Sequence, residues 1–137
     1  MKQAIQNFFK AEAFAVIGVS ANRNKFGNRV FCCLNMHYHP VYPIHPLNPQ
    51  IENIPCYATI DQLPENVTSL SVITPPSISE MIIDQAYNKG IKNIWFQPGA
   101  ESLLALQKCQ QYGINTIAGG PCILVELNCF SKNSSSI

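Results

Sequence analysis

Residues 14–30 read FAVIGVSANRNKFGNRV. An apolar run is followed by a turn that begins with small residues, and then by the start of a pattern in which apolar residues recur at helical spacing. This order is typical of a buried strand that leads into a helix in an α/β protein. The first turn of a helix presents unpaired N–H groups and partial positive charge, so an anion docks there when no bulky side chain intervenes. Gly18 leaves that approach open. The dinucleotide fingerprint G-x-G-x-x-G would require glycine where this chain has Ser20 and Arg23, which disfavours an ordinary NAD site.

Short apolar runs alternate with patterns of helical period along the rest of the chain. The apolar run at 40–44 is bounded by prolines, which is typical of a strand near the edge of a sheet. Such alternation predicts an α/β fold, a Rossmann-like, doubly wound, mostly parallel five-stranded sheet with helices on both faces. We expect strands at 14–17, 40–44, 69–73, 93–96 and 115–118, and helices at 2–10, 30–36, 77–90 and 101–112.

Two of the expected helices carry recognisable end signals. Ser77 followed three residues later by Glu80 matches a capping box, which predicts a helix start at Ser77. Gly90 and Gly113 stand where helices should end, since glycine adopts the left-handed conformation common at that position.

The loops that follow the strands are the expected ligand-binding region. Carboxyl ends of parallel strands face the same edge of a sheet, and open α/β sheets bind their ligands beyond that edge. We therefore expect one rim formed by residues 18–20, 47–49, 74–77, 97–100 and 119–122.

Length and charge limit the class of protein. The chain has 137 residues, a formal net charge of +1 and 12% charged residues. At this length we expect a single domain over residues 1–130, followed by a disordered polar tail at 131–137. The low charge gives little support for sequence-independent nucleic-acid binding. Every apolar run falls short of the roughly 20 residues that span a bilayer, so we expect a soluble protein that binds neither nucleic acid nor membrane.

The six cysteines show neither a C-x-x-C motif nor a paired metal-ligand spacing. We expect buried free thiols in a reducing cytoplasm. These are Cys32, Cys33, Cys56, Cys109, Cys122 and Cys129. The histidines, His37, His39 and His45, also lack the spacing of a metal site, and we expect no bound metal.

Four motifs in fixed order resemble the CoA-binding domain family. They are Gly18-Val19-Ser20 with Lys25 and Gly27, then Leu47-Asn48-Pro49, Ile73-Thr74-Pro75-Pro76, and Ile117-Ala118-Gly119-Gly120-Pro121-Cys122. The family includes the CoA-binding part of succinyl-CoA synthetase alpha subunits and of ADP-forming acyl-CoA synthetases, as well as small stand-alone members. The resemblance covers about residues 12–127, nearly the whole chain.

The resemblance implies a set of ligand contacts. In the synthetases the first loop holds the CoA phosphates, the Asn-Pro and proline loops flank the nucleotide, and the last loop reads G-P-N-C. Here the last loop lacks the asparagine. Stand-alone members often carry Lys directly after Asn-Pro, where this chain has Gln50, so we expect dephospho-CoA to bind nearly as well as CoA. The cofactor-binding residues implied by the resemblance are Gly18, Ser20, Lys25, Asn48, Pro49, Thr74 and Pro75. From the same loops and the expected rim we also predict contacts from Val19, Gly27, Pro76, Gln97 and Cys122.

The function implied by the resemblance is that of a small stand-alone protein that binds CoA or acyl-CoA without ligase machinery of its own. We name no catalytic residue and expect a binding module rather than an enzyme. No Walker-type G-x-x-x-x-G-K-[ST] motif occurs. One alternative is an NAD(P)-linked or CoA-thiol redox enzyme that uses Cys122, whose place at the rim would allow a reactive thiolate. Another is a nucleotide sensor that acts through a protein partner. Whether the chain forms a homo-oligomer stays open.

Overall fold

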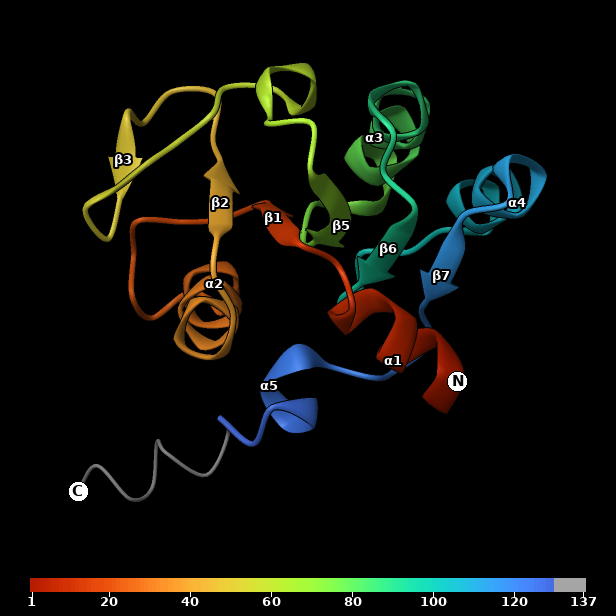
Figure 1. Cartoon of the computed structure of the whole chain (residues 1–137), viewed down its shortest axis with the longest axis horizontal. Helices are drawn as coiled ribbons and strands as arrows, with labels where there is room; N and C mark the ends of the chain where they lie inside the picture. Colours follow the sequence, from red (N-terminus) through yellow and green to blue (C-terminus); the bar gives the residue numbers. More distant parts are fainter. Residues whose placement is uncertain (130–137) are drawn as a thin grey trace.

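Five parallel strands form the central sheet in the order β2-β1-β5-β6-β7 (Figure 1). The structure, a computed structural model, describes residues 1–129. The strands are β1 (Ala13–Ile17), β2 (Val41–Ile44), β5 (Val67–Val72), β6 (Asn93–Phe96) and β7 (Asn115–Ile117). This confirms the predicted α/β fold, with the proline-bounded strand at one edge. The predicted domain boundary at residue 130 and the polar tail at 131–137 lie outside the described residues.

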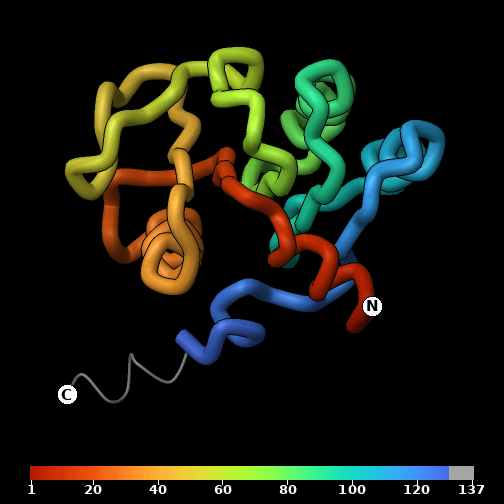
Figure 2. Tube along the Cα trace, viewed as in Figure 1, coloured from red at the N-terminus to blue at the C-terminus, as the bar shows by residue number. Residues whose placement is uncertain are grey.

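Helices cover both faces of the sheet, as Figure 1 shows. Helix α1 (Lys2–Phe9), α2 (Phe26–His37) and α5 (Ile123–Glu126) pack on one face, and α3 (Pro76–Lys89), α4 (Leu103–Tyr112) and the short helix η1 (Ile60–Gln62) pack on the other. After β7 the chain crosses back beneath the sheet, so that α5 lies beside α2 (Figure 2). Within the described residues, no helix combines the length and hydropathy needed to cross a membrane.

An aromatic cluster attaches α1 to the sheet. Phe8 is fully buried, and its ring meets the Trp95 ring edge-on at 5.2 Å between centroids. The hydroxyl of Ser69 donates to the Phe8 carbonyl at 2.7 Å, which satisfies a carbonyl at the end of α1. The Trp95 indole N–H donates to the Pro121 carbonyl at 3.0 Å and so fixes the loop that leads to α5.

The helix ends are confirmed at two positions and corrected at a third. Gly90 and Gly113 adopt the left-handed conformation after α3 and α4, as predicted. The predicted capping box at Ser77 is wrong, because α3 already begins at Pro76 and has no side-chain cap. Proline fits the first helical position, since its fixed φ suits the helix and its missing N–H would have no partner there. The Glu80 carboxylate instead accepts a hydrogen bond from the Ser102 hydroxyl at 2.6 Å.

A small antiparallel hairpin, β3 (Gln50–Ile51) and β4 (Ile54–Pro55), was not predicted. Its two turn residues, Glu52 and Asn53, have φ values of 52° and 63° in the left-handed region. Asn is among the residues that tolerate this conformation, whereas glutamate rarely adopts it. The turn places the Glu52 carboxylate beside the loop that follows β1.

The prediction of free thiols is wrong for two of the six cysteines. Cys33 on α2 and Cys129 after α5 form a disulfide across a sequence separation of 96 residues. Their pairing depends on the return of the chain beneath the sheet, which no local spacing reveals. Cys32, Cys56, Cys109 and Cys122 are free, as expected.

Candidate functional site

A cavity of about 400 Å³ lies beyond the carboxyl ends of β1, β2 and β5, against α3. This is the edge at which open α/β sheets bind ligands. Most of the lining is apolar, and a few polar groups are interspersed, as in many small-molecule sites. The cavity is lined by Ile17, Gly18, Val19, Ile44, His45, Pro46, Ala58, Thr74, Ile78, Met81, Ile82 and Gln85.

Two glycines allow the turn after β1 to pack against the start of α2. Gly18 has a φ of +96°, and a Cβ atom there would lie 2.9 Å from the Ile73 carbonyl carbon. A Cβ atom on Gly27 would lie 2.3 Å from the Gly18 carbonyl oxygen, which is backbone and cannot move aside cheaply. Both positions therefore require glycine, and their contact brings the first turn of α2 next to the cavity.

The start of α2 fits an anionic group such as a phosphate. Lys25 is the N-cap residue, its side chain makes no capping hydrogen bond, and the first turn carries no acidic residue. The helix spans 12 residues, so its first-turn N–H groups and its dipole both favour a negative charge at this end. Lys25 and Arg29 oppose the helix dipole in the protein alone, and a bound anion would offset that cost.

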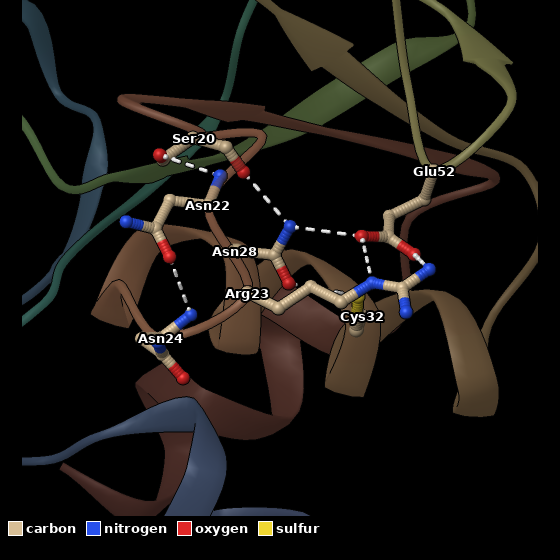
Figure 3. Close-up of polar contacts among 7 residues, drawn as sticks. All are labelled: Ser20, Asn22, Arg23, Asn24, Asn28, Cys32 and Glu52. Carbon is tan, nitrogen blue, oxygen red and sulfur yellow. Dashed lines mark hydrogen bonds and ion pairs between the residues drawn. The ribbon is translucent and has the colours of Figure 1, made fainter.

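The loop between β1 and α2 is ordered by short-range hydrogen bonds (Figure 3). The Asn22 N–H donates to the Ser20 hydroxyl oxygen at 3.0 Å, and the Asn24 N–H donates to the Asn22 side-chain oxygen at 2.9 Å. Such side-chain turns hold a loop without regular secondary structure. The loop that would face a phosphate is therefore preorganised.

A buried asparagine connects this loop to the β3–β4 hairpin (Figure 3). The Asn28 side-chain NH₂ donates to the Ser20 carbonyl at 2.8 Å and to the Glu52 carboxylate at 3.1 Å. Arg23 approaches the same carboxylate through two nitrogens, at 3.1 and 3.2 Å. We call Asn28, Glu52 and Arg23 the loop clamp. The thiol of Cys32 donates to the Asn28 side-chain oxygen at 3.4 Å.

The pKa values of Glu52 and of the neighbouring Cys32 are shifted in the folded protein. Hydrogen bonds from Arg23 and Asn28 hold the pKa of the Glu52 carboxyl below its usual value, against a smaller effect of burial. Burial raises the pKa of the Cys32 thiol, and the nearby Glu52 charge adds to this increase. Glu52 is therefore a carboxylate at neutral pH, whereas Cys32 stays a thiol.

The sequence did not indicate Asn28, Glu52 or His45 as site residues. The sequence does carry one signal for Asn28, a polar residue on the side of a helical pattern that should face the core. In the structure Asn28 is only 2% exposed. The Nδ1 atom of His45 accepts the backbone N–H groups of Leu47 at 3.1 Å and Asn48 at 3.0 Å. The ring thus shapes the loop that carries the Asn-Pro motif.

Most of the predicted ligand contacts lie at the cavity or beside it. Gly18, Val19 and Thr74 line it. Ser20, Lys25 and Gly27 belong to the adjoining loop and helix start, and Pro75 and Pro76 begin α3 behind Thr74. Asn48 follows the cavity residues His45 and Pro46, and the Pro49 carbonyl accepts the Cys56 N–H at 3.0 Å. Their roles in binding remain predictions.

Gln97 and Cys122 lie elsewhere. Gln97 is fully buried, its NH₂ group donates to the Ser71 hydroxyl at 3.3 Å, and its oxygen accepts the Ile123 N–H at 3.0 Å. The side chain thus joins two strands to the start of α5. Cys122 is the N-cap residue of α5 and packs with the hydrophobic cluster on the α2 face of the sheet.

Comparison with known proteins agrees with the sequence motifs. A sequence model of the family described as "CoA binding domain" matches residues 12–128. The chain is 26% identical over 88 residues to an ADP-forming acetate–CoA ligase from Archaeoglobus fulgidus, and the match covers 64% of this chain and 13% of that enzyme. The chain therefore spans only a small part of the ligase.

Two solved structures share nearly the whole fold. A conserved hypothetical protein from Pyrococcus furiosus has a TM-score of 0.79 and 32% identity, with 84% of this chain and 98% of that chain covered. A hypothetical protein from Pyrococcus horikoshii has a TM-score of 0.86 at 23% identity, with 93% and 89% covered, which indicates the fold alone. These relatives have the size of this chain.

Proposed function

The chain belongs to the CoA binding domain family, and on that premise we propose that it binds CoA or acyl-CoA as a small binding module. The observation that carries the proposal is the contact of Gly18 with Gly27, which sets the uncapped start of α2 beside a cavity of about 400 Å³. The uncapped helix start suits a phosphate group of CoA. The adjacent cavity suits the long, partly apolar remainder of the ligand.

Two parts of the site suit two parts of the ligand. The phosphates would meet the first-turn N–H groups of α2 and the Lys25 ammonium, which form charge-assisted hydrogen bonds with phosphate oxygens. Ile78 and Met81 on α3 are 43% and 64% exposed at the cavity, and an acyl or pantetheine chain would cover them. When bound, CoA supplies a thiol that carries acyl groups as thioesters.

A binding role fits the residues of the cavity better than catalysis does. Among its described lining residues, His45 is the one titratable side chain, and its Nδ1 atom already accepts two backbone N–H groups. Cys122 is not among the residues that line the cavity, which gives no support to a CoA-thiol reaction at that residue. A cytoplasmic location remains part of the proposal, because CoA is an intracellular ligand. The cysteines do not support this location, because two of them form a disulfide.

The proposal is tested by thermal unfolding with added ligands. A ligand that binds only the native state raises the melting temperature by mass action, so CoA should raise it and NAD and NADP should not. Equal shifts with CoA and NAD, or no shift with CoA, would overturn the preference. Dephospho-CoA should act nearly as well as CoA, since Gln50 replaces the lysine common in stand-alone members.

A charge variant localises the phosphates. Lys25→Ala should weaken CoA binding about tenfold, the loss of one charge-assisted contact, and should reduce the salt dependence of binding. Lys92→Ala is the matched control. Lys92 is exposed and directly precedes β6, so it lies at the amino-terminal ends of the parallel strands, whereas the cavity lies beyond their carboxyl ends. Equal affinities for the two variants would assign Lys25 to solvent.

A further inference from the structure

Three metal-binding side chains meet on the α2 face of the sheet, outside the CoA site. Cys33, His37 and Cys129 each offer one ligand atom, and these atoms all lie within 4.8 Å of one another. The Cys129 sulfur lies 3.7 Å from the Nε2 atom of His37. The sequence predicted no metal site because the third residue is remote from the other two.

The backbone explains why the three side chains converge. Cys33 and His37 are four residues apart on α2, so they share one side of that helix. Cys129 follows α5, and its N–H donates to the Leu124 carbonyl at 2.8 Å. Leu124 is buried in the cluster that joins α5 to α2, which holds Cys129 over the α2 surface.

The two cysteines are buried beside a small cavity, and the histidine is exposed. Cys33 and Cys129 are 3% and 8% exposed, whereas His37 is exposed to solvent. A cavity of about 190 Å³ reaches both cysteines and is also lined by Arg29 and Leu124. The cavity leaves space for a water molecule as a further ligand.

We propose that these three residues form a Zn²⁺ site when the Cys33–Cys129 disulfide is reduced. Two thiolates and one imidazole are ligands that Zn²⁺ prefers, and three protein ligands leave its fourth tetrahedral position to water. Once the S–S bond is broken, the sulfurs are free to separate to the roughly 3.8 Å that two Zn–S bonds of about 2.3 Å imply. None of the three ligands is among the residues proposed to contact CoA.

The chemistry of the exchange balances in two steps. A dithiol reductant donates two electrons and two protons, becomes a disulfide itself, and leaves Cys33 and Cys129 as thiols. Zn²⁺ then replaces both thiol protons, which pass to solvent, and accepts the lone pair of His37 Nε2. The same cysteines thus either crosslink α5 to α2 or hold the metal. Oxidation and metal binding exclude each other.

Cobalt titration of the full-length protein tests the proposal. The protein is reduced with a phosphine, which competes weakly for metals, freed of metal and titrated with Co²⁺ without oxygen. We expect one equivalent of Co²⁺ to bind with a thiolate-to-cobalt charge-transfer band, and one equivalent of Zn²⁺ to displace it. Protein with the disulfide intact should show no band. A missing band in the reduced protein, or an equal band in the oxidised one, would overturn the site.

Variants assign the ligands. His37→Gln should weaken Co²⁺ binding at least tenfold, whereas His39→Gln, the matched control on a neighbouring exposed histidine, should not change it. Cys32→Ser should keep the band, since Cys32 is not a ligand. An unchanged affinity in His37→Gln, or loss of the band in Cys32→Ser, would contradict the assignment.

Alkylation of the unaltered chain avoids variants that fail to fold. Zn²⁺ should protect Cys33 and Cys129 of the reduced protein from an alkylating agent and leave the modification of Cys56 unchanged, as measured by peptide mass mapping. Protection of Cys56 alone, or of no cysteine, would refute the site.

Discussion

Replacement of Asn28 by alanine tests whether the loop clamp holds the candidate phosphate-binding loop. The change removes a neutral hydrogen bond to the Ser20 carbonyl and a charge-assisted one to the Glu52 carboxylate. A neutral bond contributes about 1 kcal/mol and a bond to a charged group about 1.5–3 kcal/mol, so the free energy of unfolding should fall by about 2.5–4 kcal/mol. Because Asn28 is buried, water compensates for little of this loss.

Urea denaturation of the two proteins, followed by far-ultraviolet circular dichroism, measures the difference. Asn24→Ala is the control, because the Asn24 side chain is exposed and its backbone N–H would still donate to Asn22. It should change stability by no more than about 0.5 kcal/mol. CoA affinity should fall in Asn28→Ala and stay constant in Asn24→Ala. A loss of less than about 1 kcal/mol for Asn28→Ala would refute the assigned role.

Three further changes test other parts of the account. The pKa of the Glu52 carboxyl is lowered in the folded state. The ionised carboxylate therefore stabilises the fold at pH values above the pKa of Glu52 in the unfolded chain, and this stabilisation is lost as pH falls through the folded pKa. Glu52→Gln should reduce this loss of stability in acid, as measured by urea denaturation from neutral to acidic pH. Gly27→Ala should destabilise the protein by about 1–3 kcal/mol and weaken CoA binding in a titration, because the new methyl group must displace the Gly18 carbonyl. Phe8→Ala should cost about 3–5 kcal/mol in the same denaturation assay, since it empties the fully buried contact between α1 and the sheet.

The fold could be predicted from the sequence because most of its strands and helices have local sequence signals. The run at 93–96 is bounded as predicted, and Gly90 and Gly113 end helices where expected. The parallel direction of the strands then follows from the alternation of strands and helices, since parallel strands need crossover connections. The start of α3 differs from the prediction. The structure favours Pro76 over the capping box at Ser77, because the helix begins before that serine.

The features that escaped prediction depend on contacts between distant segments. Cys33 and Cys129 are 96 positions apart. Glu52 reaches Asn28 only because a hairpin with strands of two residues turns toward α2, and strands so short carry no periodic signal. Gln97 was assigned to the ligand rim from its position after a strand, yet its side chain points into the core and bonds there. Position in a loop predicts the rim, but not the direction of a side chain.

An NMR titration of the ¹⁵N-labelled protein with CoA tests directly whether CoA binds at the start of α2. We expect saturable shifts of the backbone amides of Gly18 and Ser20, of the first turn of α2 and of Thr74 with CoA, and none of these shifts with NAD. Shifts that leave these amides unmoved and cluster instead at α4, or no saturable shift at all, would contradict a CoA site at the start of α2.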